Sequence, residues 1–476
     1  MLRLHLSADV AATAASSISV TAYGSEQYLA HNRQFILRPD SAIISVIHIY
    51  LEDLMKLAAL ILFILMYVLM IAAPKYRPYI ALVTAVAFLA AGILPVSMLA
   101  SVINWNVLLM IAGTMVIVYY FIDSGMPALL ADILLSKSEN AMWVTIRMSL
   151  FAGIISAFID NVSTVLIVAP IALAICRKLR INPVGMILSV SVSSNLQGAA
   201  TLVGDTTSIM LGDYAGMNFM DFFWMHGRPG IFFAVELGAL ATIPVMFILF
   251  RNFKEKITSV EMTEVHDYLP TAMLILMVGA LITASFIPDT PSVTNGVICC
   301  TLAVITIIID TIRDGNTEDT IASVMTLDFG TLGLLTGLFV VIGGLTNTGI
   351  INDFADLIVK AGGNDKFLLY TIIVWGSVLI SAFVDNIPYV ATMLPVLTAV
   401  TSTLGIEPYL LYFGLLSGAT LGGNITPIGA SANIAAVGLL ESEGYQVSFK
   451  DFMRIGVPYT LVAVIAGYIF IWLVWS

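Results

Sequence analysis

The stretch Ser156–Pro170, SAFIDNVSTVLIVAP, returns later in the chain as Ser381–Pro395, SAFVDNIPYVATMLP. Seven of the fifteen positions are identical, and they include the pairs Asp160-Asn161 and Asp385-Asn386. Each pair lies inside an apolar run, where an ionisable side chain is costly and is by default a candidate functional residue. A motif that occurs once in each half of a hydrophobic chain is typical of secondary transporters with internal repeats.

The composition predicts an integral membrane protein. Of the 476 residues 59% are hydrophobic and only 11% are charged, whereas a soluble domain carries roughly 25% charged residues. We therefore expect a multi-pass protein in the lipid bilayer of the cell's inner or plasma membrane. The formal net charge is −11 and no basic stripe is present, so nucleic acid is not an expected partner.

The cysteines and histidines do not predict a metal centre. Cys176, Cys299 and Cys300 have no ligand spacing, and the five histidines form no HExxH or similar pair. We expect no resident cofactor.

Ten apolar runs are long enough to cross a bilayer, which takes about 20 residues. They lie near Lys56–Ala73, Pro78–Ala100, Trp105–Asp123, Pro183–Gly212, Pro229–Phe250, Tyr268–Phe286, Ser292–Asp310, Phe329–Thr346, Pro408–Leu440 and Phe452–Trp475. Two further stretches, Ala141–Cys176 and Lys366–Ser402, are too long for one helix and carry an Asp-Asn pair near the middle. We expect each to form a re-entrant hairpin with the pair at its tip, covered by protein or facing a wet cavity.

The repeat extends beyond the opening motif. An offset of 225 (385 − 160) holds without a gap from Ser156 to Ile209, and an offset of 224 aligns Trp105 with Phe329. The predicted fold is an all-α polytopic membrane protein with two inverted repeats, each with a re-entrant hairpin and a broken transmembrane helix. We divide it into a polar N-terminal extension (1–55), a first repeat (56–252), a cytoplasmic linker (253–266) and a second repeat (267–476).

Loop charge supports the inversion. The segment after the first hairpin carries Arg177, Lys178 and Arg180, whereas the equivalent 401–408 carries no base. Basic residues favour the cytoplasmic side, so the two loops are expected on opposite faces. Other bases that this topology places on the cytoplasmic side are Lys75, Arg77, Arg251, Lys254 and Lys256.

Two predicted spans, around 198–208 and 422–433, are too rich in Gly, Thr, Ser and Asn for a continuous helix. A helix broken at membrane depth frees amides, which hold anions, and carbonyls, which coordinate cations. Small residues also let helices pack closely, but packing has no need of carboxylates. The candidate substrate- or ion-binding residues are Asp160, Asn161, Ser163, Thr164, Asn195, Thr201, Gly204, Asp205, Thr206, Asp385, Asn386, Asn424, Thr426, Gly429, Ser431 and Asn433.

The coupling ion is expected to be H⁺ or Na⁺, with Na⁺ at Asn161, Asn386, Thr201 and Thr426. Asp205 aligns with Ala430 in the repeat, so only one half has an acid at this position. We expect Asp205 to be the asymmetric, proton-handling acid. The two hairpin tips and two breaks contain no Lys or Arg. A multivalent anion would therefore need bound cations, protonated carboxylates or helix N-termini.

These segments resemble the ion transporter superfamily, whose citrate-transporter-like, dicarboxylate, NhaD-type antiporter, arsenite-permease and P-protein branches share one fold. The resemblance covers Lys56 to Ser476. Its carboxylate branch has Ser-Asn-Thr at each tip, whereas Asp160-Asn161-Val162 and Asp385-Asn386-Ile387 stand here. SAFIDNVSTVL and GNITPIGASAN look most like the arsenite-permease and P-protein side. The resemblance implies a homodimer with a transport part that moves like an elevator against a scaffold.

The chain departs from these relatives after the first break. Many of them read Gly-Asp-Pro-Pro-Asn where Gly204-Asp205-Thr206-Thr207-Ser208 stands here. Cys176 and the Cys299-Cys300 pair are in different regions, so no three-thiol arsenite site is expected.

The predicted function is a secondary active transporter that moves a small ion or acid coupled to H⁺ or Na⁺. A Na⁺/H⁺ antiporter is the first alternative, because it needs only acids and carbonyls; a Na⁺-coupled di- or tricarboxylate transporter is another. An intramembrane aspartyl protease would require Gly-x-Gly-Asp, but Leu202-Val203-Gly204 precedes Asp205. A channel would need a continuous polar pore. We expect no enzymatic activity.

Overall fold

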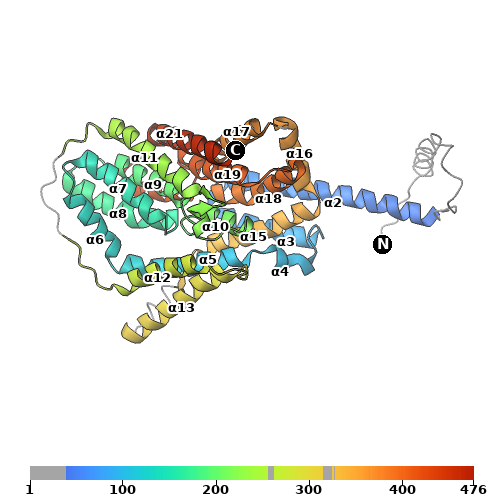
Figure 1. The fold of residues 1–476 in the computed structure, drawn as a ribbon, viewed down its shortest axis with the longest axis horizontal. Helices are drawn as coiled ribbons and strands as arrows, with labels where there is room; N and C mark the ends of the chain where they lie inside the picture. Colours follow the sequence, from blue (N-terminus) through green and yellow to red (C-terminus); the bar gives the residue numbers. More distant parts are fainter. Residues whose placement is uncertain (1–38, 256–261, 315–323, 326, 364) are drawn as a thin grey trace. The chain divides into compact units, whose positions relative to one another are not determined.

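The computed structural model describes residues 39–255, 262–314, 324–325, 327–363 and 365–476, with side chains from residue 51 onward. The chain divides into two compact units, Met1–Leu54 and Met55–Ser476. The second unit contains the segments that the sequence singles out and is the subject of the following description. It is built almost entirely of α-helices (Figure 1).

The helices of the first half begin with a long apolar helix and end before the 253–266 segment. They are α2 (Pro39–Ala72), α3 (Arg77–Ala90), α4 (Leu99–Val102), α5 (Trp105–Asp123), α6 (Met126–Ser136), α7 (Ala141–Ser156), α8 (Asn161–Leu179), α9 (Val184–Gly198), α10 (Thr206–Tyr214) and α11 (Ile231–Phe250). Between α10 and α11 lie two short antiparallel strands, β1 (Trp224–Met225) and β2 (Arg228–Pro229).

The helices of the second half follow the same order. They are α12 (Leu269–Ala284), α13 (Thr294–Asp314), α15 (Phe329–Asn347), α16 (Ile350–Gly362), α17 (Lys366–Ser381), α18 (Asn386–Leu404), α19 (Tyr409–Gly422), α20 (Ser431–Ser442) and α21 (Phe449–Trp475). Eight of the described helices are long and apolar enough to cross a membrane. The hairpins (α7 with α8, α17 with α18) and the breaks (α9 to α10, α19 to α20) are confirmed as helix pairs with irregular turns between them.

Four helices differ from the spans expected from the sequence. Helix α3 ends at Ala90 instead of continuing to Ala100, because Gly92 takes a left-handed conformation (φ 71°) and Pro95 follows. Helix α2 begins at Pro39, so part of the 1–55 segment is helical. The helices α6 and α16, which lead into the hairpins, were not expected; both begin after a glycine with positive φ, at Gly125 and Gly349.

Most helices of this unit pack as two groups. The scaffold group consists of α3, α5, α12, α13 and α15, in which α3 packs on α15 and α13 packs on α5. The hairpin group consists of α7–α11 and α17–α21, in which each hairpin packs on the broken helix of its own half. In both pairs of the scaffold group, α3 with α15 and α13 with α5, each half contributes one helix. The two halves are therefore interlocked.

Contacts between distant loops agree with the inverted topology. The expected cytoplasmic ends meet where His266 N donates to Ser124 O (3.1 Å) and where Arg177 pairs with Glu443. The expected opposite ends meet where Trp475 Nε1 donates to Pro229 O (3.1 Å). Each contact joins positions that the predicted topology places on the same face.

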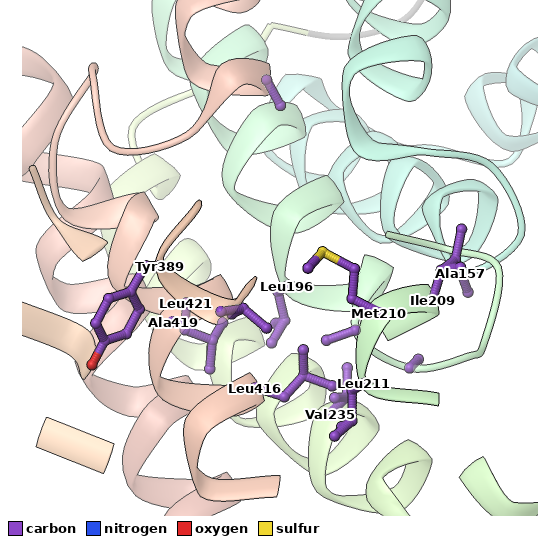
Figure 2. Packing of buried hydrophobic residues seen from close by; sticks show 14 of the residues in the cluster. Ala157, Leu196, Ile209, Met210, Leu211, Val235, Tyr389, Leu416, Ala419 and Leu421 are labelled. Atoms are coloured by element: carbon purple, nitrogen blue, oxygen red, sulfur yellow. The ribbon is translucent and has the colours of Figure 1, made fainter. Parts of the chain in front are cut away.

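The buried core lies where the two halves meet in the hairpin group. Figure 2 shows Leu196 of α9 and Leu421 of α19 close together, with Leu416 and Leu211 beside them. These four side chains are at most 3% exposed. Burial of such apolar side chains packs the two breaks against each other and brings their polar residues into one region.

One end of the scaffold group is joined to the hairpin group by a carboxylate. Asp213, at the end of α10, accepts from the side-chain amides of both Asn104 and Asn106 at the start of α5. Asn106 Oδ1 accepts in turn from Gly296 N at 2.8 Å, so α13 belongs to the same contact. This end of the α5–α10 interface is therefore closed by charge-assisted hydrogen bonds.

Candidate functional site

Each hairpin tip is the N-terminus of a helix. Asp160 is the N-cap of α8 and accepts from Ser163 N (2.9 Å), and Asp385 is the N-cap of α18 and accepts from Ile387 N (3.2 Å). Asp is among the best N-cap residues because its carboxylate satisfies free helical amides and interacts with the positive end of the helix dipole. The repeated motif thus places one carboxylate at each tip.

Each tip is fixed to the break of its own half by the same two contacts. Thr201 donates its hydroxyl to the carbonyl of Ala157, and Thr426 donates to the carbonyl of Ala382. Both pairs are buried, and they are related by the offset of 225 (382 − 157 and 426 − 201). The threonines that the sequence repeats are therefore bonded to the turns of the hairpins.

The second repeated contact involves a glycine of each break. A Cβ added to Gly204 would lie 2.5 Å from the carbonyl oxygen of Ser156, and one added to Gly429 would lie 2.8 Å from that of Ser381. No side chain fits in this space, because real Cβ contacts are not that short. Glycine is thus required here for the close approach of two backbones.

A network of asparagine side chains joins the two breaks. Asn161 Nδ2 donates to Asn195 Oδ1 (2.9 Å), and Asn195 Nδ2 donates to Asn424 Oδ1 (2.8 Å) and Asn433 Oδ1 (2.9 Å). Ser191 donates to the same oxygen of Asn433 at 2.7 Å. Because all five residues are buried, the network stabilises one relative position of the halves.

A cavity of about 470 Å³ opens beside the tips and the breaks. Its walls come from α5, α8, α10, α15, the break before α10, the tip of the second hairpin and the start of α20. Its lining residues include Thr114, Tyr119, Asp160, Asn161, Ser163, Asp205, Thr206, Asp328, Thr331, Asn386 and Ser431, together with apolar residues of α5.

Of the described residues, three carboxylates line this cavity and no Lys or Arg does. Asp205 is 2% exposed and accepts from Thr207 Oγ1 (2.7 Å) and Asn386 Nδ2 (3.3 Å). Asp328 is exposed and caps α15. Its exposed position contrasts with the half-buried position of Asp160 and the buried position of Asp205. The cavity therefore favours a cation or a proton over a free anion.

The fourth carboxylate, Asp385, is paired with a base. Arg77 Nη1 lies 2.7 Å from Asp385 Oδ2, and the two residues are 7% and 2% exposed. Ser431 Oγ donates to the same carboxylate oxygen at 2.9 Å. The sequence supplies Arg77 from the start of α3, outside the four segments from which a site was expected.

Comparison with known proteins places this arrangement in a family. The sequence profile of the citrate transporter family, CitMHS, matches residues 67–416 and 321–476. The chain belongs to this citrate transporter family. It is a multi-pass membrane protein, and several of its relatives carry transporter names.

Similar proteins come from bacteria and animals. An uncharacterized transporter of Mycobacterium tuberculosis, Rv2684, is 29% identical over 88% of this chain and 98% of its own length. The P protein of Homo sapiens is 25% identical over 84% of this chain, and the match covers 58% of the P protein's own length. The crystal structure of the Alcanivorax borkumensis YdaH transporter, described as having an unusual topology, matches with a TM-score of 0.55 at 14% identity, covering 79% of this chain and 86% of that one. The last match shows a shared fold. The family match and the P protein relative confirm the ion transporter resemblance.

In this citrate transporter family member the structure separates the expected site residues into two sets. Those that line the cavity are Asp160, Asn161, Ser163, Asp205, Thr206, Asn386 and Ser431. Those that lie behind it and hold the tips and breaks together are Thr164, Asn195, Thr201, Gly204, Asp385, Asn424, Thr426, Gly429 and Asn433. Of the four residues expected to bind Na⁺, Asn161 and Asn386 reach the cavity, whereas the hydroxyls of Thr201 and Thr426 are bonded to carbonyls.

Sequence reasoning missed Arg77, Asp328 and Thr331. The repeat gave a signal for Asp328, because the offset of 224 aligns it with Asn104 directly before the matched helices α15 and α5. Arg77 gave no such signal, because the segment PKYRP is typical of a short loop. Among the described residues, no three His, Cys, Asp or Glu side chains are close enough together to hold a metal ion.

Proposed function

We propose that this transporter moves a small ion or acid by secondary active transport, with H⁺ or Na⁺ as the coupling ion. The observation that supports this proposal is the cavity wall, in which Asp160 and Asp205 lie among amides and hydroxyls and no base is present. Such a wall binds a monovalent cation through oxygen ligands or exchanges a proton at a carboxylate.

A multivalent carboxylate does not fit this wall as a free anion. The like charges of Asp160 and Asp205 would repel it, and Arg77 is already paired with Asp385. A citrate-like passenger would therefore enter with bound cations or in a protonated form. The same observation favours a Na⁺/H⁺ antiporter as the second candidate, because that function needs no anion site.

The division into a scaffold group and a hairpin group supports an elevator movement. Each hairpin packs on the broken helix of its own half, and the two breaks share the asparagine network, so the hairpin group is connected as one body. We propose that it moves against the scaffold group. We also propose a homodimer, which the superfamily resemblance implies.

The test is a flux measurement with purified protein in proteoliposomes that contain a pH-sensitive dye. Citrate, malate, arsenite, phosphate and sulfate are offered singly under an imposed Na⁺ or proton gradient. We expect one solute to accumulate only when one of these gradients is present. Alkalinisation driven by Na⁺ without any added solute would select the antiporter, and solute flux unaffected by either gradient would contradict coupling.

A further inference from the structure

The two hairpin tips are equivalent in sequence but differ in their charge partners. Asp385 accepts from three donors: Arg77 Nη1 (2.7 Å), Ser431 Oγ (2.9 Å) and Ile387 N (3.2 Å). Asp160 accepts from Ser163 N, and no base of the described residues pairs with it. Asp160 faces the cavity, whereas Asp385 lies behind Ser431.

The ion pair between Arg77 and Asp385 is held in place by further contacts of the surrounding residues. Arg77 is itself buried, and its Nε donates to the carbonyl of Met70 near the end of α2 (3.4 Å). From the same helix Tyr67 donates to the carbonyl of Pro388, three residues beyond Asp385, at 2.7 Å. A guanidinium stays protonated at every physiological pH, so Asp385 has a permanent positive partner.

Among the described residues, the first hairpin tip has no counterpart of Arg77. Helix α13 packs on α5 as α3 packs on α15, so α13 is the equivalent element for the first tip. It carries no Lys or Arg before Arg313, and Arg313 pairs with Asp267 (3.1 Å). Asp160 is half-buried in the cavity wall, and a carboxylate there without a base needs another positive partner, a proton or a cation.

We propose that Arg77 is a built-in counter-ion that occupies the second of two originally equivalent cation sites. It removes Asp385 from ion exchange and leaves the exchangeable cation or proton to Asp160 and Asp205. Replacement of Arg77 by a neutral residue then opens a monovalent-cation site at Asp385, with Ser431 Oγ as an additional oxygen ligand. This inference rests on the proposed function only for the role of Asp160 and Asp205.

The test compares Na⁺ stabilisation of the full-length purified protein in detergent, with choline chloride replacing NaCl at constant ionic strength. The variants are Arg77→Gln, Arg77→Lys, Asp385→Asn and the double variant Arg77→Gln/Asp385→Asn. We expect the Tm of Arg77→Gln to rise with Na⁺ by at least about 2 °C more than that of wild type. The lysine variant and the double variant are expected to match the wild-type Na⁺ response.

The outcomes separate this inference from the proposed function. An Arg77→Gln response equal to that of wild type overturns the inference. If Na⁺ raises the Tm of Arg77→Gln but not that of wild type, the inference is supported. The flux test of the proposed function then decides separately whether transport is coupled to Na⁺. If Arg77→Gln does not fold in any buffer, the double variant decides: a folded double variant supports the counter-ion role, because removal of both charges leaves nothing unpaired, and an unfolded one overturns it.

Discussion

Asn386 Nδ2 lies 3.3 Å from Asp205 Oδ2, so the tip of the second hairpin donates a hydrogen bond to the break of the first half. The two residues are 3% and 2% exposed, and both line the cavity. Asp205 itself has Ala430 as its counterpart in the repeat. The contact therefore joins the halves at a position where they differ chemically.

Replacement of Asn386 by Asp tests this contact. It would place a second carboxylate at hydrogen-bond distance from Asp205, and like-charge contacts of this kind cost several kcal/mol. We expect a lower Tm in detergent for Asn386→Asp than for Asn386→Ala, which only loses the bond. Asn352→Asp on the exposed face of α16 is the matched control and should leave Tm unchanged. Equal Tm values for the Asp and Ala variants would contradict the contact.

Asp160→Asn should preserve the fold and reduce transport. The amide still caps α8, but the cavity loses a carboxylate that no base neutralises. We expect a decrease in coupled flux of roughly 10- to 100-fold, which corresponds to the ~1.5–3 kcal/mol of a hydrogen bond to a charged group. Asp356→Asn, on an exposed position of α16, is the control. Wild-type flux in Asp160→Asn would exclude this carboxylate from the transport site.

Gly204→Ala and Gly429→Ala should each destabilise the protein. A Cβ would lie 2.5 Å from Ser156 O in the first case and 2.6 Å from Gly423 O in the second. Forced overpacking of this kind costs about 1–3 kcal/mol, visible as a lower Tm and a lower folded yield. Gly438→Ala in α20 meets no atom within 4 Å and should be neutral or slightly stabilising. A similar decrease in Tm for all three variants would mean that the close contacts at Gly204 and Gly429 do not cause the destabilisation.

Asn195 and Asn424 should behave as one unit. Asn195→Ala and Asn424→Ala each leave buried partners without a hydrogen bond, at a cost of about 1–3 kcal/mol. Since both variants break the same bond, the double variant is expected to lose less stability than the sum of the single variants. A double-mutant cycle based on thermal unfolding measures this difference. Strict additivity would show that the bond between the breaks contributes nothing.

Much of the fold follows from local sequence. The span Trp105–Asp123 was predicted with the bounds of α5, because the apolar run is uninterrupted. The structure adds that Asn104 caps this helix. The breaks were predicted because Gly, Ser and Thr gather within single spans. Helix α3 was overestimated, because apolar residues continue past Ala90 and the turn depends on Gly92 and Pro95.

The site was only partly predictable. Carboxylates inside apolar runs are rare and are candidate functional residues by default, so Asp160, Asp205 and Asp385 were predicted from the sequence. The partner of Asp385 was not predicted, because Arg77 is 308 residues away in the sequence. Its segment, PKYRP, is also typical of a loop. Which candidates face the cavity also depends on tertiary packing: Asn161 reaches it, whereas Asn195, which accepts from Asn161, does not.

The bond of Asp213 with Asn104 and Asn106 has no equivalent in the other half. The offsets of the repeat align Asp213 with Gly438 (438 − 213 = 225) and Asn104 with Asp328 (328 − 104 = 224). Under the proposed elevator movement the two end states therefore differ in free energy, since only one of them gains this contact. The empty carrier of that proposal rests in one orientation, and a passenger reverses this preference only by binding the other state more tightly.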